Sequence, residues 1–350
     1  YRYDHGYLPD FAGMDRFRGA IVHPQHWPAD LDCAGREVVV IGSGATAITL
    51  VPALAEDAAH VTMLQRSPSY IASVPARNPV VNLLRRVLPR RAADDAIRWT
   101  LALGTQATYV VSRRRPDLVK RILRRGVARQ LPRGYDVDTH FTPRYDPWDQ
   151  RLCAVPDGDL FKAIRAGTAS VVTDRIDTFT ETGLRLESGA ELDADVIVTA
   201  TGLELLFLGG IELSVDGEVV DVAMRLTYKG MMLEDVPNLA LAVGYTNASW
   251  TLKCDLTCGY VTRLLNHLRA TGNRQCTPRN RDASVVPQPL LGLSSGYVQR
   301  SAARFPKQGS KFPWQVHQSY LRDYRALRRS RLEDDAMEIG NPASEVLVGG

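Results

Sequence analysis

One short segment constrains the fold of this chain more than any other. An apolar run, Glu37-Val38-Val39-Val40-Ile41, is followed at once by Gly42-Ser43-Gly44-Ala45-Thr46-Ala47. The run has the continuous β-branched character of a strand that is buried on both faces. Residues 45–55 then have a helical pattern, and residues 60–65 predict a second strand. This order of strand, crossover helix and strand predicts a parallel α/β sheet.

The glycine-rich turn fits the pattern G-x-G-x-x-A, which holds the diphosphate of a dinucleotide when it joins a strand to a helix. In that role Gly42 allows the tight turn and Gly44 lets the backbone approach the phosphates, while the small Ala47 lets the helix pack on the sheet. Free N–H groups at the helix start attract the phosphates. The predicted diphosphate-binding residues are Gly42, Ser43, Gly44, Ala45, Thr46 and Ala47.

The end of the second strand indicates which nicotinamide cofactor fits. About 20 residues past the turn, sites for NADH place an acidic residue that binds the ribose 2′-hydroxyl. This chain has Arg66 and Ser67 at the corresponding position. A guanidinium beside a hydroxyl suits a 2′-phosphate, so we expect NADPH. The alternative is an ordinary surface arginine at a strand end.

The pattern of apolar residues and turn signals predicts the remaining elements. Residues 1–32 have no lasting periodicity and are expected to be loop. Strands are expected at 169–173, 195–200 and 238–243, a hairpin at 183–192 and a helix at 251–269. The chain from 273 onward is rich in Pro, Gly and Arg, and is expected to be irregular apart from a short helix at 320–329.

Composition and charge narrow the function classes. The 350 residues suffice for two domains, and no apolar run approaches the roughly 20 residues that span a bilayer. Residues 77–133 hold fifteen basic and three acidic side chains, so this helical segment has a formal charge of +12. The rest of the chain is therefore acidic, because the total formal charge is only +4. We favour a solvated arginine face; attraction to an anionic membrane surface is the alternative. Nucleic acid is not expected, because aromatic residues are sparse there.

Five scattered cysteines have no disulfide or zinc spacing, so we expect no metal site and a reducing, cytoplasmic environment. Peripheral membrane association through the basic insert is the alternative to a purely cytoplasmic location. The first residue is Tyr1 rather than Met, which leaves open a processed or absent start.

A segment upstream of the turn resembles the fingerprint of Baeyer–Villiger flavin monooxygenases. It fits F-x-G-x-x-x-H-x-x-x-W-P at every fixed position: Phe17, Gly19, His23, Trp27 and Pro28. The strand that ends in Ala200-Thr201-Gly202 also resembles the crossover of two-dinucleotide flavoproteins. Residues 147–153, 228–232 and 244–250 resemble the branch of this family that includes the mycobacterial ethionamide-activating enzyme.

The resemblance implies an α/β fold of the two-dinucleotide-binding flavoprotein type. It implies an interdomain linker at 1–34, a Rossmann NADPH domain at 35–200 with a helical basic insert at about 77–140, the carboxy-terminal part of an FAD domain at 201–330, and a tail at 331–350. Such enzymes begin with an FAD-binding unit that has its own glycine-rich turn, and no second turn of this kind follows a strand here. We therefore expect an amino-terminal FAD portion outside this sequence; a shortened protein is the alternative.

The resemblance further implies that NADPH reduces FAD, and that a flavin peroxide then inserts one oxygen atom of O2 into a ketone or oxidises a thioether. Arg151 is expected to stabilise the negative charge, and the alternative is an ion pair between Arg151 and Asp149. Gln150 stands where ketone-oxidising relatives often have lysine. His23 and Trp27 are expected to order the interdomain segment. The cofactor-contacting residues that the resemblance adds are Ala200, Thr201, Gly202, Asn247 and Ala248.

Two other functions stay open from the sequence. One is a nitrogen- or sulfur-oxidising flavin monooxygenase without ester-forming activity. The other is a non-catalytic NADPH-binding fragment that lacks FAD. Helix capping by Asn247 or Ser249 is an alternative to flavin binding at the helix that follows them.

Overall fold

A computed structural model describes residues 1–342, and the chain divides into two compact units. Unit 1 holds Tyr1–Ala93, Val110–Leu205 and Leu293–Tyr297. Unit 2 holds Asp94–Tyr109, Leu206–Gly292 and the described chain after residue 297. Each unit has its own apolar core, and each is described separately below.

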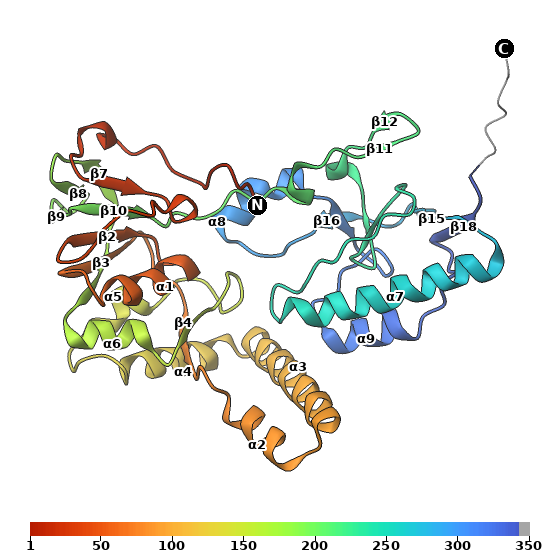
Figure 1. The fold of residues 1–350 in the computed structure, drawn as a ribbon, viewed down its shortest axis with the longest axis horizontal. Helices are drawn as coiled ribbons and strands as arrows, with labels where there is room; N and C mark the ends of the chain where they lie inside the picture. The colour runs from red at the N-terminus through yellow and green to blue at the C-terminus, as the bar shows by residue number, and fades with distance from the viewer. Residues whose placement is uncertain (343–350) are drawn as a thin grey trace. The chain divides into compact units, whose positions relative to one another are not determined.

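Unit 1 is built on a five-stranded parallel sheet with the order β1-β10-β2-β3-β6 (Figure 1). Its strands are β1 (Ala20–Val22), β2 (Glu37–Ile41), β3 (His60–Gln65), β6 (Ala169–Thr173) and β10 (Val196–Thr199). The order places β2 at the centre of the sheet, which explains its continuous apolar sequence. The carboxyl end of this central strand leads directly into the glycine-rich turn.

Two different layers cover the faces of this sheet. The helices α1 (Ala45–Leu54) and α6 (Asp159–Ala166) pack on the face that includes Val38 and Val40. The other face, which includes Val39, packs against the antiparallel sheet of β7 (Ile176–Phe179), β8 (Gly183–Leu186) and β9 (Glu191–Asp193). Because side chains alternate along β2, those on one face pack against the two helices and those on the other face pack against the antiparallel sheet.

The crossover unit, the strands at 169–173 and 195–200 and the hairpin are confirmed, but the prediction that residues 1–32 are loop was wrong. β1 forms an edge strand that pairs with β10 in the register Ile21↔Ile197. Three residues are too few to give a periodic signal, so pairing with β10 determines their conformation. Two 3₁₀ turns flank this strand, at Met14–Arg16 and Pro24–His26.

The basic segment is helical, as predicted. It contains α2 (Pro79–Val87), α3 (Arg90–Arg114), α4 (Pro116–Ala128) and α5 (Val137–Phe141). The chain enters it from β4 (Ile71–Val74) and leaves it into β5 (Cys153–Pro156), and these two strands pair in parallel. α3 belongs to both units, since Asp94–Tyr109 clusters with unit 2.

Unit 2 is organised around the long helix α7 (Trp250–Thr271), which packs on α9 (Tyr320–Arg328). Its core includes the buried rings of Tyr228, Tyr260 and Trp314. The remaining elements are the strand pairs β11 (Ser214–Val215) with β12 (Glu218–Val219), β13 (Thr227–Tyr228) with β14 (Met232–Leu233), β15 (Gln275–Pro278) with β18 (Met337–Gly340) and β16 (Pro287–Pro289) with β17 (Lys307–Gly309), together with α8 (Gly296–Ser301) and 3₁₀ turns at Phe207–Gly210, Val222–Met224 and Ala302–Arg304.

Two expectations about unit 2 were wrong, although the helices at 251–269 and 320–329 are confirmed. Residues 238–243 form no strand; the Leu241 N–H donates to the carbonyl of Met231 at 2.6 Å, but no ladder continues from it. The chain after residue 273 is less irregular than predicted, because β15 pairs with β18 across 60 residues of sequence, and local pattern does not reveal such long-range pairing. Residues 343–350 of the predicted tail lie outside the described residues.

Within residues 1–342, no helix combines the length and the apolar character that crossing a bilayer requires.

Candidate functional site

The turn after β2 has a backbone that only glycine accommodates. Gly42 has φ of 134°, and a Cβ built on it would overlap the carbonyl oxygen of Ala200. Its N–H donates to the carbonyl of Leu64 at 2.8 Å, which fixes the turn against β3. Only a residue without a side chain fits between β10 and β3 here.

Gly44 meets a different requirement. It is the N-cap of α1, its φ of −79° suits any residue, and a Cβ on it would have no atom within 4 Å. No side chain of the described residues caps this helix. The N–H groups of the first turn of α1 therefore face open space with their partial positive charge. The buried Ala47 packs this turn against the sheet.

Arg66 lies beside this turn. It directly follows β3, and its side chain is exposed. Ser43 ties the two segments together, since its Oγ bonds the carbonyl of Ser67 at 3.2 Å and the Oγ of Ser69 at 2.9 Å. Arg66 forms no hydrogen bond or ion pair within residues 1–342. Its guanidinium is thus available to an anion at the edge of the sheet where the turn lies.

Ala200, Thr201 and Gly202 lie at the same edge. The Ala200 carbonyl faces Gly42, and the Thr201 hydroxyl donates to the carbonyl of Tyr7 at 2.5 Å. Gly202 accepts the N–H of Tyr7 at 3.1 Å and has φ of 112°. The structure therefore brings the residues after β10 next to the glycine-rich turn, and it uses their polar groups to hold the first residues of the chain.

The fingerprint segment makes structural contacts. Phe17 packs in the core edge-on against Phe179, with ring centroids 6.3 Å apart. A Cβ on Gly19 would overlap the carbonyl of Asp195. The His23 Nδ1 accepts the N–H of Gln25 at 3.2 Å, and burial lowers the pKa of His23. His23 thus caps a 3₁₀ turn, and its role in ordering the interdomain segment stays a prediction.

Two further fingerprint residues follow this turn. Trp27 is half-buried and packs against the core of unit 1, and Pro28 comes directly after it and is exposed.

Arg151 does not form the ion pair with Asp149 that was the alternative to its catalytic role. The carboxylate of Asp149 instead accepts from Arg113 at 2.6 Å and from the N–H of Asp146 at 3.1 Å. Arg151 is exposed and precedes β5, whose first residue bonds the Tyr70 carbonyl. Because β5 runs parallel to β4, Arg151 lies near the segment that joins Arg66 to β4.

In unit 2, Gln318 holds the residues before α7, and these residues form no side-chain helix cap. The Asn247 Nδ2 donates to the carbonyl of Gln318 at 3.0 Å, and the N–H of Thr246 donates to the Gln318 Oε1 at 3.0 Å. The Ser249 hydroxyl bonds that of Thr251, so no side chain caps α7. The alternative of helix capping by Asn247 or Ser249 was therefore wrong. Ala248 lies between them and packs on the core of unit 2.

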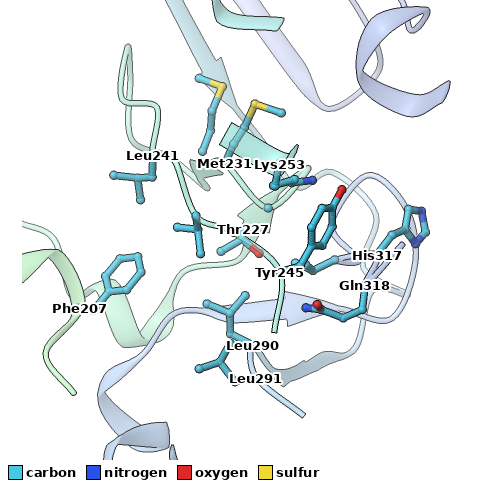
Figure 2. A pocket seen from close by; sticks show the side chains of 15 residues that line it. Phe207, Thr227, Met231, Leu241, Tyr245, Lys253, Leu290, Leu291, His317 and Gln318 are labelled. Carbon is cyan, nitrogen blue, oxygen red and sulfur yellow. The ribbon is translucent and has the colours of Figure 1, made fainter. Parts of the chain in front are cut away.

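Unit 2 has a pocket that is partly open to solvent (Figure 2). Its apolar lining includes Leu241 and Leu290, and Thr227 contributes a buried hydroxyl without a hydrogen-bond partner among the described residues. Lys253 reaches the wall from α7 and pairs with Asp323 at 2.9 Å. The lining of the pocket is therefore mainly apolar, with Thr227, Lys253, His317 and Gln318 among its polar members.

Sequence reasoning missed two buried lysines in this unit. Lys229 pairs with Asp334 at 3.0 Å, and Lys253 pairs with Asp323, which also accepts the Tyr245 hydroxyl at 2.7 Å. Burial lowers the pKa of both lysines, and the paired carboxylates oppose this shift. The position of Lys253 on the apolar face of α7 was the available signal, but its partner lies 70 residues away in the sequence.

The arrangement fits one dinucleotide. In unit 1, an uncapped helix start, a turn with two glycines and a free guanidinium match the diphosphate and 2′-phosphate of NADPH. Unit 2 has no second strand–turn–helix of this type within its described residues. For FAD, these residues offer the uncapped start of α7, whose N–H groups suit the electron-rich edge of a flavin.

A parallel sheet with this turn and this cation defines a dinucleotide-binding α/β protein, here joined to a second unit with a pocket. Residues 2–243 match the family described as flavin-binding monooxygenase-like. The chain belongs to this family, which confirms the predicted flavoprotein monooxygenase class.

Several known proteins resemble the chain. It is 50% identical over 349 residues to the FAD-containing monooxygenase EthA of Mycobacterium tuberculosis H37Rv, covering 99% of this chain and 71% of that protein. It is 48% identical to the probable FAD-binding monooxygenase AlmA of Acinetobacter baylyi, covering 99% and 70%.

Two solved structures share the fold at low sequence identity. A steroid monooxygenase bound to NADP has a TM-score of 0.66 at 20% identity, with 96% of this chain and 73% of that chain covered. A cyclohexanone monooxygenase from Rhodococcus sp. Phi1 bound to NADP⁺ has a TM-score of 0.65 at 16% identity, with the same coverage. The predicted mixed α/β fold of the two-dinucleotide flavoprotein type is confirmed.

Proposed function

We propose that this chain carries out NADPH- and FAD-dependent oxygenation of a ketone or thioether with O2. The observation that carries the proposal is the uncapped start of α1 beside the free guanidinium of Arg66. NADPH supplies the reducing equivalents and FAD, once reduced, activates O2. The relative named as an FAD-containing monooxygenase supports FAD, and the steroid monooxygenase structure bound to NADP supports the nicotinamide cofactor.

Each proposed role in NADPH binding follows from chemistry. The backbone from Gly42 to Ala47 holds the diphosphate through N–H groups that no side chain competes for. Arg66 and Ser67 bind the 2′-phosphate, and the guanidinium stays charged at every working pH. Ala200, Thr201 and Gly202 form the neighbouring wall. Residues 35–200 are thus the proposed NADPH domain, preceded by a linker at 1–34.

Arg151 is the proposed catalytic residue. Oxygen transfer to a ketone places negative charge on the carbonyl oxygen of the substrate, and a fixed cation stabilises that charge without reorganising. Asp149 is occupied by Arg113, so no described carboxylate neutralises Arg151. Residues 201–330 are proposed to belong to the FAD domain, where Asn247 and Ala248 shape the α7 start that contacts the flavin.

One experiment tests the proposal. The purified chain is incubated with FAD, desalted and supplied with NADPH and either a ketone or a thioether, and the ester or sulfoxide is quantified. We expect retained flavin absorbance and product, with a loss of product of about 10² to 10³-fold in Arg151→Ala. NADPH oxidation should persist in that variant. Arg133→Ala, which removes an exposed arginine of the insert, is the control.

Failure has two distinct forms in this experiment. If the chain takes up no FAD, catalysis by this chain is refuted and a non-catalytic NADPH-binding function replaces it. If Arg151→Ala forms product at the unmodified rate, Arg151 has no part in the oxygenation.

We also propose that the basic helical insert brings the protein to an anionic membrane surface, in addition to its small-molecule substrate.

A further inference from the structure

The helix α2 has an unusual environment for a helix of its composition. Five of its nine residues and its C-cap residue Leu88 are aliphatic, yet none of the side chains of α2 is buried. Val80, Leu83 and Val87 are 48%, 59% and 62% exposed. An isolated helix of nine residues is marginal in water, and most helices of this length depend on packing of an apolar face. α2 therefore lacks the apolar contact that its sequence is built for.

The apolar side chains of α2 share one face. Val80, Leu83, Leu84 and Val87 recur with the three- and four-residue spacing of one helical stripe, while Asn82, Arg85 and Arg86 occupy the rest of the circumference. The Asn78 side chain caps the helix by accepting the N–H of Val80 at 3.0 Å. The helix thus begins at a defined point with its apolar stripe exposed to solvent.

The charge around this stripe has a single sign. Residues 77–93 contain five arginines and no acidic residue; Asp94 and Asp95 come only at the next helix. None of the five forms an ion pair within the described chain, and they are Arg77, Arg85, Arg86, Arg90 and Arg91. A protein partner that covered this stripe would have to supply several carboxylates, whereas an anionic bilayer surface supplies both the negative charge and the apolar layer.

We propose that α2 lies in the headgroup region of an anionic membrane, with Val80, Leu83 and Val87 inserted and the flanking arginines bound to lipid phosphates. Figure 1 shows α2 in orange, between β4 and α3 along the chain. This inference specifies the membrane contact proposed above, and it does not depend on the oxygenase assignment. The NADPH-binding turn comes from a different part of unit 1, so loss of one property leaves the other measurable.

The test is co-sedimentation of the full chain with vesicles of phosphatidylcholine alone or with 40% phosphatidylglycerol, in roughly 0.1 M salt. We expect binding to the anionic vesicles only, and release as salt is raised. Arg85→Gln/Arg86→Gln should weaken binding about 30-fold, at a factor of about five per arginine. Leu83→Ser/Val87→Ser should weaken it at least tenfold.

Matched controls change equivalent exposed residues elsewhere. Ile211→Ser/Val219→Ser removes two aliphatic side chains that are 66% and 73% exposed in unit 2, and it should leave vesicle binding unchanged. Far-ultraviolet circular dichroism and urea unfolding, measured on every preparation, confirm that the variants fold; NADPH affinity is measured beside them as a separate property.

Equal binding to both vesicle types, or unchanged binding in both α2 variants, would overturn the proposal. So would concentration-dependent dimerisation that Leu83→Ser/Val87→Ser abolishes in the absence of vesicle binding, because a second copy would then cover the stripe. Loss of NADPH binding with intact vesicle binding would refute the cofactor assignment instead.

Discussion

Replacing Arg66 by alanine tests the cofactor assignment most directly. The side chain is exposed and forms no interaction within residues 1–342, so its removal should leave the free energy of unfolding nearly unchanged. Its only expected role is toward a ligand. NADPH and NADH differ by the 2′-phosphate alone, so any effect of Arg66 on the ratio of their dissociation constants reports contact with that phosphate.

The magnitude follows from the exposure of the guanidinium. Hydrogen bonds to charged groups contribute about 1.5 to 3 kcal/mol, and an exposed partner belongs at the low end of that range. Arg66→Ala should therefore raise the dissociation constant of NADPH about tenfold, since 1.4 kcal/mol corresponds to a factor of ten. The dissociation constant of NADH should stay within twofold.

Titration calorimetry with each cofactor measures this ratio. Arg36→Ala is the matched control, because Arg36 is also exposed but precedes β2 at the opposite end of the sheet. Raising the salt concentration should weaken NADPH binding by the unmodified protein more than by Arg66→Ala. An equal loss of affinity for both cofactors would contradict the 2′-phosphate role, and no loss for either would place the site elsewhere.

Three further predictions concern stability and the turn. Gly42→Ala should lower the free energy of unfolding by about 2 to 4 kcal/mol, whereas Gly44→Ala should leave urea unfolding nearly unchanged and abolish NADPH binding; the opposite pattern would reverse their roles. Lys253→Met strands the buried carboxylate of Asp323 and should cost about 3 to 5 kcal/mol, much of which a second change, Asp323→Leu, should restore. Because burial lowers the pKa of His140, the unfolded chain binds a proton first as pH falls below 6.5, so stability should drop on acidification, and less so in His140→Gln.

The sequence identified the parts of the fold whose signals are local. The strand, turn and helix from Glu37 to Leu54 could be predicted because two glycines and a continuous β-branched run have few other structural solutions. β1 could not be predicted, because a three-residue edge strand acquires its conformation from β10. The strand predicted at 238–243 shows the opposite situation. Its local pattern is typical of a strand, but these residues form no continuous ladder of hydrogen bonds with another strand in the described chain.

The candidate site was predictable to a similar extent. The position of Arg66 at the sheet edge beside the turn could be predicted, because one crossover helix fixes its distance from the turn; its binding role stays a prediction. The ion pair of Arg151 with Asp149 was a wrong alternative, since Arg113 reaches Asp149 from a helix 36 residues away. Ser69 was missed, although it joins Ser43 at 2.9 Å, because a serine in a loop has no pattern of its own. The sequence did not show which polar side chains would pair with residues far away in the chain.

The two glycines of the turn are needed for different reasons, one for the fold and the other for the proposed binding of a phosphate. Gly42 is required by the fold, since Ala200 occupies the space of any side chain. At Gly44 the backbone angles and the open space accept other residues, and Ser or Asp there would cap α1 and stabilise the helix by a few tenths of a kcal/mol. Such a side chain would bind the N–H groups that a phosphate needs. The helix therefore begins with a weaker cap than this position allows, and a bound phosphate would supply the missing interaction and link ligand binding to the stability of unit 1.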